Sequence, residues 1–62
     1  MTGAQLKVRR IRAKISLRGL AARLLISPSY LCDLEKGKRT GERAQAQIAK
    51  AVAELRAMAV KP

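Results

Sequence analysis

The residues best suited to chemistry in this sequence lie on one face of a short helix predicted over residues 28–36. Five of its positions follow the spacing i, i+1, i+4, i+5, i+8, which places side chains on one side of a helix. They are Pro28, Ser29, Cys32, Asp33 and Lys36. The chain has no histidine, its four carboxylates do not cluster in sequence, and its glycines match no phosphate-binding fingerprint. This chemistry suits non-covalent recognition, and we expect no enzyme activity, no metal site and no cofactor.

The helix that carries this face has two defined ends. Ser27 can cap its first turn, and Pro28 suits the first helical position because its missing N–H costs nothing there. Gly37 supplies a left-handed residue just past the last turn. Leu31 and Leu34 point to the other side, so one face of the helix anchors it and the opposite face is exposed.

Three further helices are predicted around it. One covers about residues 17–24, capped by Ser16, and almost no linker separates it from residues 28–36, so the two must cross steeply as a helix-turn-helix. The others cover about residues 4–13 and, with apolar residues at i, i+4, i+7 and i+11, about residues 42–59. We therefore predict an all-α, compact four-helix domain over residues 3–60 with a long last helix.

Composition narrows the class of partner. The chain has 62 residues and a net charge of +10, from fourteen Lys and Arg against four Asp and Glu. Small soluble domains usually carry a net charge of about 2–8, so this bias predicts a polyanion, nucleic acid before membrane. One cysteine cannot form an internal disulfide, and no apolar run has the length of a membrane span. We expect a cytoplasmic protein with no membrane partner.

The run from Leu6 to Leu55 resembles the Cro and phage-repressor, or xenobiotic-response-element, family of helix-turn-helix domains. The matching residues follow the family's order over most of the chain. They are Leu6, Arg10, Ser16, Leu20, Ala21, Ile26, Ser27, Tyr30, Leu31, residues 34–39 and residues 48–52. The resemblance implies a lambda-repressor-like fold and a double-stranded DNA-binding transcriptional regulator, such as a repressor, at the nucleoid of a bacterium or encoded by a phage.

Two positions depart from the family's pattern. Leu25 stands where the family usually has glycine, and leucine costs about 1 kcal/mol in a left-handed turn. Either the turn is strained or the helix over residues 17–24 runs longer. Leu17 stands where the family often has a glutamine that holds a DNA phosphate, a contact for which Ser16 or Arg18 can substitute.

By position in the motif, four residues are expected to read bases. They are Pro28, Ser29, Cys32 and Asp33. Ser29 can donate or accept, Pro28 and Cys32 can pack against a thymine methyl, and the Asp33 carboxylate can accept from a cytosine amino group. Asp33 has an equal alternative, an ion pair with Lys36 at i+3. This set lacks Arg, Gln and Asn, so phosphates should supply much of the affinity.

The expected phosphate contacts are hydroxyls and cations. They are Ser16, Arg18, Ser27, Tyr30, Lys36, Lys38, Arg39 and Thr40. The loop over residues 37–41 brings two cations next to flexible main-chain N–H groups, although a merely solvated loop remains an alternative. The resemblance also pairs Arg10 with Glu35 as a structural ion pair, against the alternative of two unrelated surface charges.

The C-terminal end of the last helix is predicted to extend beyond the small core. Leu55, Met58, Ala59 and Val60 would then form a possible dimer surface, unless the tail folds back on the first helix. We expect a homodimer on an inverted repeat. Two other functions stay open: a DNA-binding antitoxin or adaptor that binds a partner protein through the last helix, and a membrane-active peptide.

Overall fold

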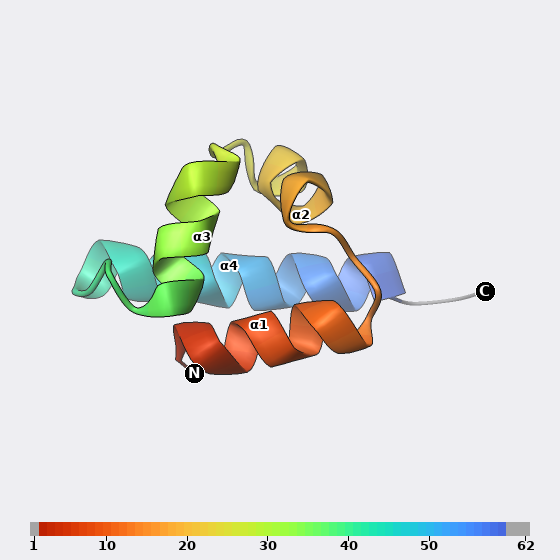
Figure 1. Ribbon diagram of the computed structural model, residues 1–62, viewed down its shortest axis with the longest axis horizontal. Helices are drawn as coiled ribbons and strands as arrows, with labels where there is room; N and C mark the ends of the chain where they lie inside the picture. The colour runs from red at the N-terminus through yellow and green to blue at the C-terminus, as the bar shows by residue number, and fades with distance from the viewer. Residues whose placement is uncertain (1, 60–62) are drawn as a thin grey trace.

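The computed structural model describes residues 2–59 as four helices and, within that range, no strand (Figure 1). These are α1 (Gly3–Arg12), α2 (Leu17–Leu24), α3 (Pro28–Lys36) and α4 (Glu42–Ala59). The predicted all-α fold with a long last helix is therefore confirmed. The predicted domain ends at Val60, which lies outside the described residues. None of the four helices combines the length and the apolar character needed to cross a membrane.

The first and last helices lie side by side and run in the same direction, while α2 and α3 lie across them (Figure 1). α1 packs against α3 and α4, and α2 packs against the same two helices. The core takes side chains from all four helices. They are Leu6, Leu20, Ala21, Leu24, Leu31, Leu34, Ala44, Ile48, Ala51 and Leu55. Packing on α1 and α2 thus fixes the orientation of α3.

Side-chain caps begin the first three helices. The Thr2 hydroxyl accepts from the Gln5 N–H at 3.2 Å, and the Thr2 N–H donates back to Gln5 Oε1 at 2.9 Å, which makes a capping box. Ser16 Oγ accepts from the Gly19 N–H at 3.0 Å, and Ser27 Oγ accepts from the N–H at position 30 at 3.1 Å. These caps satisfy first-turn donors and set where α2 and α3 start.

The same three helices end in one hydrogen-bond pattern, built on a left-handed residue. At the end of α3, the Lys38 N–H donates to the Asp33 carbonyl and the Gly37 N–H to the Leu34 carbonyl, which is a Schellman motif. The left-handed residues are Lys14 (φ 58°) after α1, Leu25 (φ 59°) after α2 and Gly37 (φ 78°) after α3. Of the two alternatives at Leu25, the strained turn is therefore the one observed.

Replacing Leu25 by glycine is expected to raise the free energy of unfolding by about 1 kcal/mol. Leucine strains this backbone conformation whereas glycine does not, and the Leu25 side chain is 92% exposed, so little packing is lost. Leu25→Ala is the matched control, because alanine keeps a Cβ in the strained conformation and should change the stability by less than about 0.5 kcal/mol. Urea denaturation measures both variants. Equal stabilisation by alanine would show that side-chain exposure, and not the backbone, sets the effect.

Candidate nucleic-acid interface

The outward face of α3 carries the five side chains that the spacing placed there. Pro28, Ser29 and Lys36 are exposed, while Cys32 and Asp33 are half-buried. The two leucines on the opposite side of the helix are fully buried in the core. The face therefore offers a hydroxyl, a carboxylate and an ammonium group to any ligand that approaches along the helix.

A buried ion pair ties α3 to α1. Arg10 Nε donates to Glu35 Oε2 at 2.7 Å and Arg10 Nη2 donates to Glu35 Oε1 at 3.2 Å, so the pair is bidentate. The third nitrogen, Nη1, donates to the carbonyl of Ile15 at 3.0 Å in the α1–α2 connection. The two charged side chains are only 13% and 4% exposed. One arginine thus joins α1, α3 and the connection before α2, and Glu35 is turned away from the exposed face.

Sequence reasoning missed Gly3, where α1 approaches the end of α3 too closely for any side chain. A Cβ built at Gly3 would lie 1.8 Å from the Leu34 carbonyl oxygen and 3.0 Å from the Glu35 Cα. Gly3 and Arg10 lie seven residues apart, two turns of helix, so both meet α3 from the same side of α1. The available signal was a glycine inside a first helical turn, where alanine is the better helix former.

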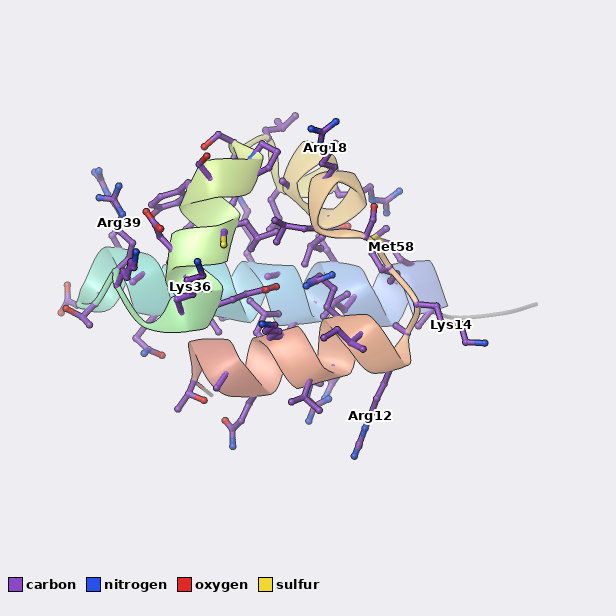
Figure 2. All side chains as sticks on the ribbon, viewed as in Figure 1. Arg12, Lys14, Arg18, Lys36, Arg39 and Met58 are labelled. Atoms are coloured by element: carbon purple, nitrogen blue, oxygen red, sulfur yellow. The ribbon has the colours of Figure 1, made fainter. Side chains whose placement is uncertain are left out.

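Arg39 extends from the loop after α3 back along one side of that helix (Figure 2). Its Nε lies 3.7 Å from Asp33 Oδ2, and its guanidinium carbon lies 5.3 Å from the centre of the Tyr30 ring. Within residues 2–59, the ion pair of Asp33 is thus with Arg39 and not with Lys36. The Arg39 side chain remains 56% exposed. The five outward side chains of α3 include no arginine. Arg39 therefore adds a guanidinium group to this face from the loop that follows the helix.

The other predicted phosphate contacts surround α3. Arg18, Lys36, Lys38 and Thr40 are exposed, and Figure 2 shows Arg18 on α2 and Arg39 on the other side of α3. The capping hydroxyls of α2 and α3 accept N–H bonds through oxygen, which leaves each O–H able to donate to a phosphate. Hydroxyls and cations are thus available on both sides of the outward face of α3.

The end of α4 is more buried than the predicted dimer surface requires. Leu55 is 4% exposed and belongs to the core, so the prediction that it lacks intramolecular partners is wrong. Met58 is half-buried and packs against the core, and only Ala59 of the three is exposed. The physical reason is that α1 runs beside α4 in the same direction. The core between them therefore extends along α4 as far as Leu55, beyond the point at which the sequence predicted it to end.

Comparison with known proteins identifies a family for this chain. A family model described as a helix-turn-helix domain matches residues 2–59, which are the residues that the structure describes. No curated protein and no solved structure matches the chain significantly. The match spans α2, the strained turn at Leu25 and α3, and it confirms the sequence resemblance to a helix-turn-helix family.

Proposed function

Because the chain belongs to the helix-turn-helix domain family, whose members bind DNA, we propose that it is a sequence-specific transcriptional regulator that inserts α3 into the major groove. The observation that carries the proposal is the outward face of α3, held rigidly by the Arg10–Glu35 pair and flanked by exposed cations. One α-helix fits the width of the major groove. A net charge of +10 supplies the attraction to the phosphate backbone.

Base reading is assigned to Pro28, Ser29, Cys32 and Asp33. The Arg39 guanidinium beside the Asp33 carboxylate offsets part of its negative charge, which lowers the repulsion between that carboxylate and nearby phosphates. Asp33 can then accept a hydrogen bond from a cytosine amino group at a smaller electrostatic cost. Arg39, Lys38 and Lys36 contact the backbone beside it.

We also propose that two copies occupy an inverted repeat. A single α3 with few strong base-reading side chains specifies only a few base pairs, and two half-sites about one helical turn apart would multiply that specificity. DNA shape between the half-sites adds discrimination without further contacts.

Selection from a random duplex library at physiological salt, followed by footprinting on the enriched sequence, tests the proposal. The expected result is an inverted repeat whose half-sites lie about one helical turn apart. A single enriched half-site would support the assignment of α3 and overturn the paired arrangement. No enrichment despite tight binding at low salt would overturn sequence-specific recognition.

Replacing Lys38 by alanine is expected to weaken binding to all duplexes alike. A plot of the logarithm of the binding constant against the logarithm of the salt concentration should have a slope of about −4 to −5 per protomer. Losing one phosphate contact should reduce the magnitude of this slope by about 1. Lys50→Ala is the matched control, because Lys50 is exposed on the side of α4 opposite to the buried Ile48. Fluorescence anisotropy across a salt series measures the slopes. An equal decrease in both variants would assign the effect to net charge and not to the loop.

A further inference from the structure

A groove of about 700 Å³ runs between α1 and α4. Its lining combines small apolar side chains with three arginines and contains no carboxylate. The apolar part includes Val8, which is 49% exposed, together with Val52 and Ala59. The arginines are Arg9, Arg12 and Arg56. The groove therefore offers a ligand both apolar contact and three positive charges.

This groove faces away from the proposed DNA interface. Gly3 and Arg10 meet α3, whereas Gln5 and Arg12 line the groove, and each lies two residues further along α1. Two residues correspond to about 200° of rotation around a helix, so the groove opens on nearly the opposite side. Figure 2 shows Arg12 pointing away from α2 and α3, and Arg18 pointing the other way. The groove therefore stays accessible while α3 contacts DNA.

The three arginines of the groove favour an acidic ligand. A second copy of this chain would bring three more arginines and a further net charge of +10 against the first set, and like charges in contact are strongly unfavourable. A phosphate backbone would leave the apolar floor uncovered. An amphipathic helix with acidic flanks satisfies both parts, because its apolar stripe covers Val8 and Val52 while its carboxylates pair with the arginines.

We propose that the α1–α4 groove binds an acidic amphipathic helix of a partner protein. α1 has ten residues and is about 15 Å long, so it can accompany about three turns of such a helix. This function is separate from DNA binding. It would connect a DNA-bound domain to a second protein without requiring any change in the contacts of α3.

A pair of synthetic helical peptides tests this proposal. Both carry the same Leu and Ala face, and the opposite face carries glutamates in one peptide and lysines in the other. Each is titrated into the ¹⁵N-labelled full chain at physiological salt, with and without a bound duplex. The glutamate peptide is expected to shift amide signals around Val8, Arg12, Val52 and Arg56 in both conditions. The lysine peptide is expected to shift none.

Two charge-matched double variants locate the site. Arg12→Glu with Arg56→Glu should weaken binding of the glutamate peptide at least about tenfold and create binding of the lysine peptide. Arg18→Glu with Lys36→Glu changes the net charge equally and should leave peptide binding within about threefold while abolishing DNA binding. All four positions are exposed, and circular dichroism checks that both variants remain helical.

Four results would overturn the proposal. The first is no binding of the glutamate peptide, and the second is a shift pattern centred on α3 and residues 37–41, which would make the peptide a mimic of DNA. The third is a shift of the groove signals on adding duplex alone, which would assign the groove to nucleic acid. The fourth is a shift of the same signals on raising the protein concentration, which would assign it to a second copy. The first two results leave the expected outcome of the DNA selection unchanged.

Discussion

Replacing Glu35 by alanine is expected to lower the free energy of unfolding by about 3–5 kcal/mol. The substitution leaves the Arg10 guanidinium, only 13% exposed, beside the core without its carboxylate. An uncompensated buried charge costs far more than the lost attraction alone. A single core of this size supplies about 3–5 kcal/mol in total, so the variant should be largely unfolded at room temperature. Urea denaturation followed by circular dichroism measures the change.

The chain provides a matched control for this substitution. Arg23 and Glu54 form an ion pair between α2 and α4 at 3.1 Å, but their side chains are 52% and 33% exposed. Glu54→Ala should therefore cost at most about 1 kcal/mol. Replacing both members of the buried pair, Arg10→Met with Glu35→Leu, should recover a folded domain because no charge is left unpaired. Equal costs for Glu35→Ala and Glu54→Ala would show that the buried pair does not hold α1 against α3.

Replacing Gly3 by alanine is expected to destabilise the domain by about 3 kcal/mol, at the upper end of the range for overpacking. The added Cβ would fall 1.8 Å from the Leu34 carbonyl oxygen, which is backbone and cannot turn aside as a side chain can. Either α1 moves away from α3 or its first turn unwinds and loses the Thr2 capping box. The same denaturation experiment measures this loss.

Gly19→Ala serves as its control, with a much smaller expected effect. A Cβ at Gly19 would meet only Ser16 Oγ, at 3.0 Å, and this side chain, which caps α2, must shift by a few tenths of an ångström, a cost that the helix propensity of alanine offsets by up to about 1 kcal/mol. The two glycine substitutions therefore separate a packing requirement from backbone preference. Destabilisation of similar size in both variants would contradict the assignment of Gly3 to close helix packing.

Local signals were enough to predict the exposed face of α3. Ser27 and Pro28 at its start and Gly37 at its end act within one turn of helix, and Leu31 and Leu34 mark the buried side. The helical period alone then places the remaining side chains outward. At Leu25 the sequence could only pose two alternatives, because a left-handed leucine and one more helical residue differ by about 1 kcal/mol.

Features that depend on contacts between distant segments could not be predicted in this way. The loop that carries Arg39 has no period, so its sequence does not reveal that the guanidinium reaches Asp33. The clash at Gly3 depends on the distance between α1 and α3, which no local pattern encodes. The burial of Leu55 depends on α1 running beside α4, whereas the period of α4 shows only which face is apolar.

The pairing of α1 with α4 determines when this domain can form during synthesis. Ile48, Ala51 and Leu55 of α4 complete the core, and α1 packs against α4. As the chain leaves the ribosome, the first three helices emerge before α4, and short helices without a packing partner are barely stable in water. We therefore expect the nascent chain to stay unfolded until the last turns of α4 have emerged, and the domain then to fold in one step.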